Sequence, residues 1–446
     1  MVRGFQRVIS LLVNSFLVGA STFLSQEEHE KSICGEPEKH HSGYINGLFY
    51  VFYETRRVIR ETTDVPVVLW LSGGPGCSGL IAMFVENGPC SVGQGSPTAE
   101  LNTYSWTKSA HMLYVDQPRG TGFSPSRNSN SLHVQHSDWA ESSAIEDLTI
   151  FLQGFFQQNP SYASNDLYIF GESYGGRYVP DLVHHIMTSD NSNNDQLKKN
   201  LRGIGIGNGL VSEKANCDTI GSFAQTTSKG QLANATQSLV DQCDEAVQAC
   251  QAPSFGGVND CSRTNVCTRL SGQIISAAHS LNMNHYDIRA PCYPDAFNLC
   301  YKFTPLFMFV NMASTMETLG MPGHSWAPCN QDVFSHVMNA DWFEESEYKV
   351  AYVLNHGVRV LIYAGDYDLI CNWMGQDKWT QEMVWDHQTE FRAQPLSAWK
   401  INGQEAGQKR SFGNLTMLRV YNAGHMVPHD QPEVALEMFS SFIHPN

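Results

Sequence analysis

The sequence is poor in basic residues and therefore lacks the charge that nucleic-acid binding requires. Lysine and arginine together number 28, against 44 aspartates and glutamates, and the formal net charge is −16. Nucleic acids and anionic membrane surfaces are bound chiefly by clustered basic side chains. The composition argues against either as a partner.

Long apolar runs are also missing after the first 24 residues, so no later segment predicts a membrane-crossing helix. Residues 1–24 carry two arginines before a short apolar run and small residues near Ala20, which is typical of a secretory signal peptide. Asn14 and Ser15 interrupt the run and argue against a stable membrane anchor. We expect residues 25–446 to form one functional domain.

A C-x2-C pair is absent among the twelve cysteines, so the spacing typical of structural zinc sites is missing. Disulfides persist in proteins that follow an oxidising route, and this cysteine content agrees with secretion. Eight of the twelve lie between residues 212 and 330. We expect local disulfides there, and neither a metal nor an organic cofactor. Sequons at Asn234 and Asn414 are compatible with glycosylation.

Short apolar segments that end in turn residues recur along the chain and predict an α/β fold. They are PVVLWLSGG (66–74), HMLYVDQP (111–118), DLYIFGES (166–173), LRGIGIGNG (201–209), RVLIYAGD (359–366) and TMLRVYNAG (416–424). Nearly continuous apolar runs of this length are typical of strands buried on both faces. With helical stretches at 139–157 and 430–443, they predict a mostly parallel central sheet flanked by helices.

Two other stretches depart from this alternation. Residues 42–55 predict an antiparallel hairpin at the edge of the sheet. Residues from 212 to about 330 lack a strand–helix repeat, and we expect them to form a disulfide-rich cap inserted over the carboxyl ends of the strands. Open α/β sheets carry their active sites at that edge, so such a cap would shape access for the substrate.

The segment GESYG fits a G-x-S-x-G pattern with Ser173 at its centre. A predicted strand precedes it and a predicted helix follows it, which is the setting of a nucleophile elbow. A serine nucleophile needs a base, and the base needs an orienting acid. Downstream candidates are Asp366 or Asp368 and then His425, with His429 as a rival. This is the chain order of α/β-hydrolases, although the residues alone leave the choice of aspartate open.

Several motifs in one order resemble the serine carboxypeptidase family from about residue 40 to the C-terminus. They are WLSGGPGCS (70–78), DQP (116–118), GTGFS (120–124), GESYGG (171–176), DLICNW (368–373) and GHMVP (424–428). The resemblance implies Ser173 as nucleophile, His425 as general base and Asp368 as orienting acid. It also implies an oxyanion hole formed by the backbone N–H groups of Gly74 and Tyr174.

The resemblance further implies that Glu172, Glu86 and the Ser72-Gly73 segment bind the free carboxylate of the substrate. Two carboxyl groups that share a buried site cannot both ionise cheaply, so at least one pKa is raised. A protonated glutamic acid can then donate a hydrogen bond to that carboxylate. Ser72 stands where the family usually has asparagine, and a serine hydroxyl is shorter than an asparagine amide.

Apolar substrate pockets are implied by residues that match pocket positions of the family. Ile370, Cys371 and Met426 match such positions, and so do Tyr286 and Tyr301. We expect these pockets to favour hydrophobic residues on both sides of the scissile bond.

The resemblance implies the disulfides Cys77–Cys329 and Cys292–Cys300 and a thiol at Cys371. We also expect a nested arrangement of Cys243–Cys267 and Cys250–Cys261. Three cysteines then remain without an assigned partner: Cys34, Cys90 and Cys217.

Together the motifs imply a serine-type carboxypeptidase that releases C-terminal amino acids at acidic pH. Its substrates would be the C-termini of peptides or proteins, in a lysosome-like or vacuolar compartment or outside the cell. The alternative is an acyltransferase or esterase on the same scaffold. A homodimer is compatible with this interpretation.

Overall fold

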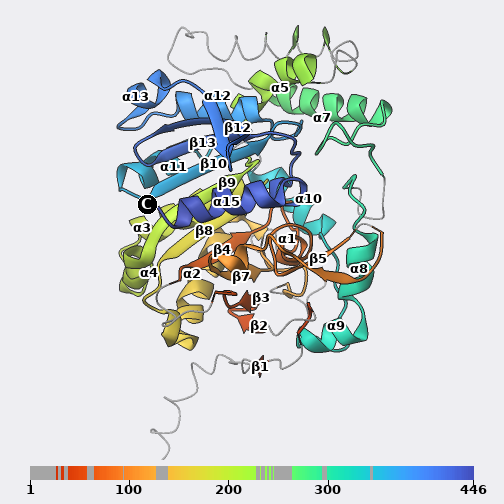
Figure 1. Cartoon of the computed structure of the whole chain (residues 1–446), viewed down its shortest axis with the longest axis vertical. Helices are drawn as coiled ribbons and strands as arrows, with labels where there is room; N and C mark the ends of the chain where they lie inside the picture. Colours follow the sequence, from red (N-terminus) through yellow and green to blue (C-terminus); the bar gives the residue numbers. More distant parts are fainter. Residues whose placement is uncertain are drawn as a thin grey trace, which may run out of the picture.

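A single large sheet runs through the centre of the protein. The computed structural model describes residues 27–28, 32–34, 39–57, 65–93, 95–126, 139–227, 264–293, 299–341 and 345–445, with short pieces between 232 and 245. Within these residues the sheet has 11 strands in the order β1-β2-β3-β7-β4-β8-β9-β10-β13-β12-β11 (Figure 1).

The middle of this sheet is parallel, as the sequence predicts. Adjacent strands from β7 to β13 pair in parallel. They are β4 (Val67–Leu71), β7 (His111–Val115), β8 (Leu167–Glu172), β9 (Leu201–Gly207), β10 (Arg359–Gly365) and β13 (Leu415–Val420). Every residue of β4, β7 and β8 is buried, because side chains on both faces of a central strand pack against helices.

The two edges of the sheet are antiparallel. The predicted hairpin is present as β2 (His40–Ile45) and β3 (Leu48–Tyr53), with β1 (Glu27–Glu28) beside it. At the other edge, β11 (Ser397–Ile401) and β12 (Gln404–Phe412) extend the sheet from β13. Sequence analysis did not predict this second pair, because its exposed, polar residues lack the apolar run of a buried strand.

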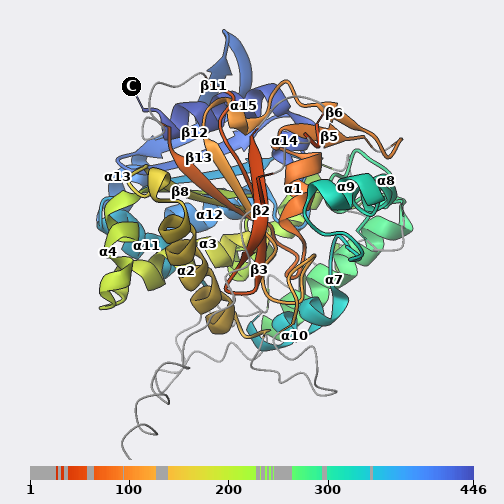
Figure 2. The ribbon, with the colours of Figure 1, turned by 90° about the horizontal axis from the view of Figure 1, so that it is seen from below.

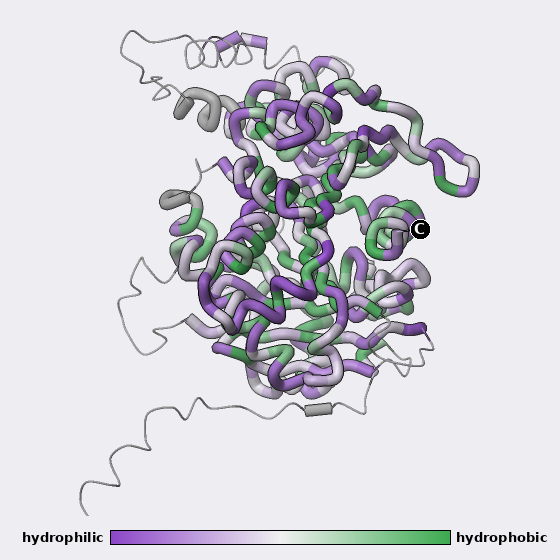
Figure 3. The backbone as a smooth tube through the Cα atoms, turned by 90° about the vertical axis from the view of Figure 1, so that its left-hand side faces the viewer, coloured by the Kyte–Doolittle hydropathy of each residue, from purple (hydrophilic) through white to green (hydrophobic). Residues whose placement is uncertain are grey.

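Helices cover both faces of the sheet (Figures 1 and 2). One face packs against α2 (Glu141–Gln158), α3 (Gly175–Thr188), α11 (Glu347–Asn355) and α12 (Trp373–Glu382). The other face packs against α1 (Gly79–Val85) and α15 (Pro432–Ile443). Alternate residues of one strand serve the two faces: Leu69 joins the first core and Trp70 the second. Figure 3 shows hydrophobic stretches running through the middle of the molecule, where these strands lie.

Several further elements outside the expected cap are short or lie at the periphery. They are β5 (Cys90–Val92), β6 (Ala99–Leu101), α4 (Asp195–Asn200), α10 (Gln331–Asp341), α13 (Gln388–Ala393) and α14 (Val427–Asp430). None of the helices in the described part of the chain is long and apolar enough to cross a membrane.

The described part of the stretch expected to form a cap consists of helices joined by turns and loops, such as residues 281–293 and 319–330. It contains α5 (Glu213–Thr227), α7 (Thr264–Ser280), α8 (Thr304–Val310) and α9 (Ala313–Thr318). In Figure 1, α5 and α7 lie at one end of the molecule, whereas α8 and α9 lie along its side. The boundaries of the cap as a separate unit stay a prediction.

Two predicted disulfides are confirmed, and a third joins two of the unassigned cysteines. Cys77–Cys329 ties the loop after β4 to the distant end of the expected cap, and Cys292–Cys300 closes a short loop within it. The third is Cys34–Cys90. Cys217 is a buried thiol whose Sγ lies 3.5 Å from Oε1 of Glu213.

Several expectations fall on parts of the chain that the structure leaves out. The signal peptide (1–24), the sequon at Asn234 and the two nested disulfides of residues 243–267 lie outside the described residues. The other sequon is described: Asn414 lies in the turn between β12 and β13, where its Nδ2 donates to the carbonyl of Gly357 at 3.1 Å.

Candidate active site

Ser173 stands at the sharp turn between β8 and α3. Its φ is +60°, a left-handed conformation that a residue with a Cβ rarely adopts. The surrounding backbone holds it there, because its N–H donates to the carbonyl of Gly207 at 3.1 Å and its carbonyl accepts from Leu210 at 2.8 Å. This strained turn presents the hydroxyl at the carboxyl ends of the parallel strands, as a nucleophile elbow does.

Glycines allow the loop after β4 to pass close to this turn. A Cβ on Gly73 would lie 2.6 Å from both the Cβ of Ser173 and the backbone nitrogen of Tyr174. A Cβ on Gly175 would lie 2.7 Å from the carbonyl oxygen of Leu71. Real Cβ atoms essentially never come this close to other heavy atoms. The glycines of both motifs are therefore required by packing at the turn itself.

His425 and Asp368 form a buried pair at the ends of two neighbouring strands. Nδ1 of His425 lies 2.7 Å from Oδ2 of Asp368, and neither side chain is more than 4% exposed. The carboxylate also accepts from Nδ2 of Asn208 at 2.8 Å and from the backbone N–H of Ile370 at 3.1 Å. An acceptor at Nδ1 places the proton of a neutral imidazole there, which leaves Nε2 able to accept another.

These contacts separate the two aspartates and the two histidines that the sequence left open. Oδ2 of Asp366 lies 3.7 Å from Nη2 of Arg419 in β13, so this carboxylate forms an ion pair away from His425. His429 places its Nδ1 3.1 Å from the carbonyl oxygen of Val85. Of these two aspartates and two histidines, Asp368 and His425 are the two whose side chains hydrogen-bond to each other in the described structure.

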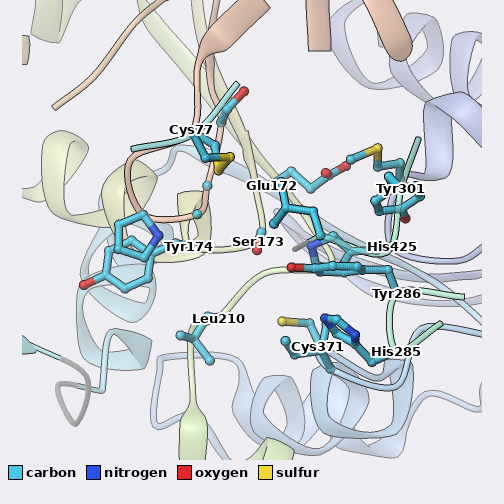
Figure 4. Close-up of a pocket in the computed structure, with 18 of the residues that line it drawn as sticks. Cys77, Glu172, Ser173, Tyr174, Leu210, His285, Tyr286, Tyr301, Cys371 and His425 are labelled. Carbon is cyan, nitrogen blue, oxygen red and sulfur yellow. A yellow bond between two sulfur atoms is a disulfide. The ribbon is translucent and has the colours of Figure 1, made fainter. Parts of the chain in front are cut away.

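One cavity of about 650 Å³ unites the predicted site residues (Figure 4). Asp368 lies behind His425, and the others line the cavity: Ser72, Gly73, Gly74, Glu86, Glu172, Ser173, Tyr174, Ile370, Cys371, His425 and Met426. Tyr286 and Tyr301 line it too. The ring of Tyr286 packs against the imidazole of His425 with centroids 4.9 Å apart, which limits rotation of that ring.

Glu86 and Glu172 bring two carboxyl groups together in this cavity. Each is only 5% exposed, and the two side chains hydrogen-bond to each other. Burial raises the pKa of Glu86 to about 7. Burial, and then the charge of Glu86, raise the pKa of Glu172 well above its usual value. Oε2 of each residue has no hydrogen-bond partner among the described residues, so the pair has capacity to bind a ligand.

Ser72 extends this polar surface from the neighbouring loop. Its Oγ accepts a hydrogen bond from Nε1 of Trp70 at 3.2 Å, and its side chain is buried. An indole N–H only donates, so this bond uses a lone pair of the hydroxyl and leaves its proton available. Ser72 can therefore donate to an acceptor in the cavity, as the asparagine amide of the family would.

Gly74 lies in the loop after β4 and Tyr174 directly follows Ser173 in the elbow, and both line the cavity. Gly74 has a φ of +109°, and the turn that contains it is held by Cys77, which donates to the carbonyl of Gly73 and forms the disulfide with Cys329. Tyr174 precedes the first turn of α3, where backbone N–H groups have no partner within the helix. Its hydroxyl donates to Oε2 of Glu141 at 3.3 Å, which anchors the side chain.

Comparison with known proteins identifies the family. Residues 32–445 match the family model described as serine carboxypeptidase. This chain belongs to the serine carboxypeptidase family. Serine carboxypeptidase-like 48 of Arabidopsis thaliana is 37% identical, over 91% of this chain and 78% of that protein. A serine carboxypeptidase-like protein of Oryza sativa subsp. japonica is 38% identical, over 90% of this chain and 91% of that protein.

A solved structure supports the same fold. Kex1(Δ)p, a prohormone-processing carboxypeptidase from Saccharomyces cerevisiae, superposes with a TM-score of 0.75 at 21% sequence identity, covering 93% of this chain and 94% of that chain. The predicted α/β-hydrolase fold, with its large and mostly parallel sheet, is confirmed. The protein is a hydrolase of the serine carboxypeptidase type, and its disulfides are consistent with the secretory pathway.

Sequence analysis missed several residues that line this serine carboxypeptidase's cavity or support the residues that do. Asn208, which bonds to Asp368, follows β9 in the motif GNG, and a polar residue between glycines at a strand end could have signalled it. Glu213 and Asn216 enter the cavity from α5, and His279 and His285 enter it from α7 and the loop that follows. Their positions depend on how these helices pack, which no local pattern records.

Two groups of side chains in the described residues come close enough to hold a metal ion. In the first, His279 lies near Cys292 and Cys300, but the two sulfur atoms form a disulfide and offer no thiolate. In the second, Asp368 and His425 bond to each other beside Cys371. Burial raises the pKa of the Cys371 thiol, which disfavours the thiolate that a metal would need.

Proposed function

We propose that this protein removes the C-terminal residue from peptides at acidic pH through an acyl-enzyme formed on Ser173. The observation that carries the proposal is the carboxyl pair Glu86–Glu172, which lies in the same cavity as Ser173 and the His425–Asp368 pair. Ser173, His425 and Asp368 supply the acyl-transfer chemistry. The Glu86–Glu172 pair recognises the free carboxylate at the end of the substrate.

The chemistry proceeds in two halves. His425 accepts the proton of Ser173 at Nε2 while the serine oxygen attacks the carbonyl carbon of the last peptide bond. The backbone N–H groups of Gly74 and Tyr174 stabilise the negative oxygen of the tetrahedral intermediate. His425 then gives the proton to the departing amine, and a water molecule hydrolyses the acyl-enzyme by the same steps. Asp368 holds the imidazole in position and stabilises its charged form.

The carboxyl pair accounts for selection of the C-terminus. A protonated glutamic acid donates a hydrogen bond, so the Glu86–Glu172 pair can bind a carboxylate where two ionised groups would repel it. The hydroxyl of Ser72 adds a donor from the adjacent loop. An amide at the same end of the substrate bears no charge and forms weaker hydrogen bonds to these donors.

A pair of substrates tests the proposal. We expect the protein to release the last amino acid from an N-blocked dipeptide at acidic pH, and to process the matching C-terminal amide at least about tenfold less efficiently, because charge-assisted hydrogen bonds are the stronger ones. Chromatographic assay of the released amino acid measures both rates, and Ser173→Ala is the inactive control. Equal kcat/KM values for acid and amide would contradict recognition by the carboxyl pair.

The carboxyl pair also predicts how binding varies with pH. Glu86, whose pKa is raised to about 7, is protonated below that pH and ionised above it. KM for a blocked dipeptide should therefore be low and nearly constant at acidic pH, and should rise by up to about tenfold per pH unit above pH 7 as the donor is lost. An enzyme with this dependence is suited to an acidic compartment.

Steady-state kinetics from pH 4 to about pH 8.5 on wild type and Glu86→Gln would test this dependence. Glutamine donates at every pH, so we expect the rise of KM to be smaller in the variant. A KM that stays flat across the range in the wild type, or rises equally in both proteins, would contradict the assignment.

A further inference from the structure

Asn208 contacts Asp368 from the end of the neighbouring strand. It directly follows β9 and is fully buried. Its Nδ2 donates to Oδ2 of Asp368 at 2.8 Å, and its Oδ1 accepts from the backbone N–H of Gly365, the last residue of β10, at 3.1 Å. A backbone N–H can only donate, so the amide oxygen faces Gly365 and the amide nitrogen faces the carboxylate. The two partners therefore fix the orientation of the amide.

The amide of Asn208 and the imidazole of His425 meet at the same carboxylate oxygen. Oδ2 of Asp368 also accepts from Nδ1 of His425, at 2.7 Å. The positive end of the amide dipole thus lies close to the imidazole, with one oxygen atom between them. In this position it stabilises the ionised aspartate and opposes a positive charge on the imidazole. Because a serine nucleophile needs a neutral imidazole as its base, the dipole favours the reactive form of His425.

The ionisable groups around the His425–Asp368 pair are largely uncharged at acidic pH. Burial raises the pKa of Glu86 to about 7, and burial and then the charge of Glu86 raise the pKa of Glu172 well above its usual value. Burial also lowers the pKa of His285 to about 3. Other groups that act on the pair or on these neighbours are Tyr286, Tyr301, Cys371, Glu213, His429 and Asp430, the last paired with Arg289. With the nearest carboxyl groups protonated, the orientation of neutral dipoles becomes important for the base.

We propose that Asn208 is a positioning residue that keeps His425 unprotonated at acidic pH and so allows the nucleophile to be activated there. This inference deepens the proposed function, because it rests on the acyl chemistry assigned to Ser173, His425 and Asp368. Without the amide, Asp368 keeps its hydrogen bonds from His425 and from the N–H of Ile370. Its carboxylate would then attract a proton to the imidazole more strongly, and the base would be lost at a higher pH.

A purely structural role for Asn208 gives a different expectation. Its backbone N–H donates to the carbonyl of Tyr363 at 2.8 Å, and its φ of +40° is left-handed. These features join the ends of β9 and β10, whatever the side chain does to the base. A residue with this role alone would change stability and the amount of active enzyme. It would leave the pH dependence of the active fraction unchanged, so a pH profile separates the two roles.

The test measures how fast a fluorophosphonate labels Ser173 between about pH 3.5 and about pH 8. The serine oxygen displaces fluoride from phosphorus while His425 accepts the serine proton, and the probe carries no carboxylate for the Glu86–Glu172 pair to bind. We expect the acid midpoint of the labelling rate to lie about one pH unit higher in Asn208→Gly than in wild type. Relative to each protein's own plateau, labelling well below both midpoints would then be about tenfold slower in the variant.

A second variant and a control accompany this measurement. Glycine adopts a left-handed φ without strain, and Asn208→Ser keeps a Cβ but is too short to bond to Asp368, so we expect the same upward shift in both variants. Asn402→Gly is the matched control. Asn402 is also a left-handed asparagine, with a φ of +51°, but it is exposed in the turn between β11 and β12. We expect this variant to keep the wild-type midpoint.

The outcomes separate the inference from the proposed function. An acid midpoint that is the same in wild type and both Asn208 variants, or lower in the variants, would overturn the role of Asn208 and leave the proposed function intact. A wild-type enzyme that is not labelled, or a Ser173→Ala variant that is labelled at the wild-type rate, would overturn the acyl chemistry and the inference with it.

Discussion

Replacing Asp368 with asparagine should lower kcat for a blocked dipeptide by about 10⁴-fold, with a much smaller change in KM. Oδ2 of Asp368 accepts from Nδ1 of His425 and from Nδ2 of Asn208. An asparagine that turns its amide nitrogen to His425 donates to Nδ1 and stabilises the other tautomer. Nε2 then carries a proton and cannot accept one from Ser173, so the chemical step fails while the substrate still binds.

The neighbouring aspartate provides the control for this prediction. Asp366 is buried at the same strand end, but its near contact is Arg419 at 3.7 Å. We expect Asp366→Asn to keep kcat within about threefold of wild type, since it leaves the catalytic tautomer unchanged. Circular dichroism would check the fold of both variants. If Asp368→Asn kept more than a tenth of wild-type kcat, or both variants lost activity alike, the assignment of Asp368 would be wrong.

The choice between these aspartates marks the limit of what the sequence could predict for the site. Both follow the same apolar strand, two residues apart, and either could point toward a histidine. Their distinction depends on the turn after β10, in which Asp368 meets Asn208 and the N–H of Ile370. Resemblance to the family selected Asp368, and local physical chemistry could not.

The central sheet was predictable because its strands are buried on both faces. A continuous apolar run such as β4 or β8 records that burial directly in the sequence. The edge strands β11 and β12 carry polar, largely exposed residues and leave no such record. Glu213 was missed for a related reason: its place in the cavity depends on the packing of α5 against α12 and α7, which are distant in the sequence.

Replacing Gly73 with alanine should reduce kcat/KM by about 10²-fold to 10³-fold. The added methyl group would push the loop after β4 away from Ser173 and from the backbone N–H of Tyr174. A Cβ at this position would lie 2.6 Å from the Cβ of Ser173 and from the nitrogen of Tyr174, and 2.7 Å from the carbonyl oxygen of Glu172. Two of these atoms belong to the backbone of a strained turn. They cannot give way without moving the nucleophile.

Two measurements would detect this displacement of the loop relative to Ser173. The rate of covalent labelling by a serine-reactive fluorophosphonate reports on Ser173 itself, and the midpoint of thermal unfolding reports on the fold. We expect slower labelling, and a loss of stability of about 1–3 kcal/mol, the usual range for overpacking. Gly93→Ala is the control, because its Cβ would meet nothing within 4 Å and its φ is not left-handed.

Wild-type labelling and turnover in Gly73→Ala would mean that the loop after β4 moves freely, and the oxyanion assignment of Gly74 would then lose its support. The two glycines are adjacent, so a shift that relieves the clash at Gly73 also carries the N–H of Gly74 away from Ser173. Loss of labelling together with an intact fold would tie the loop to the chemistry, since the nucleophile, histidine and aspartate are all unaltered in this variant.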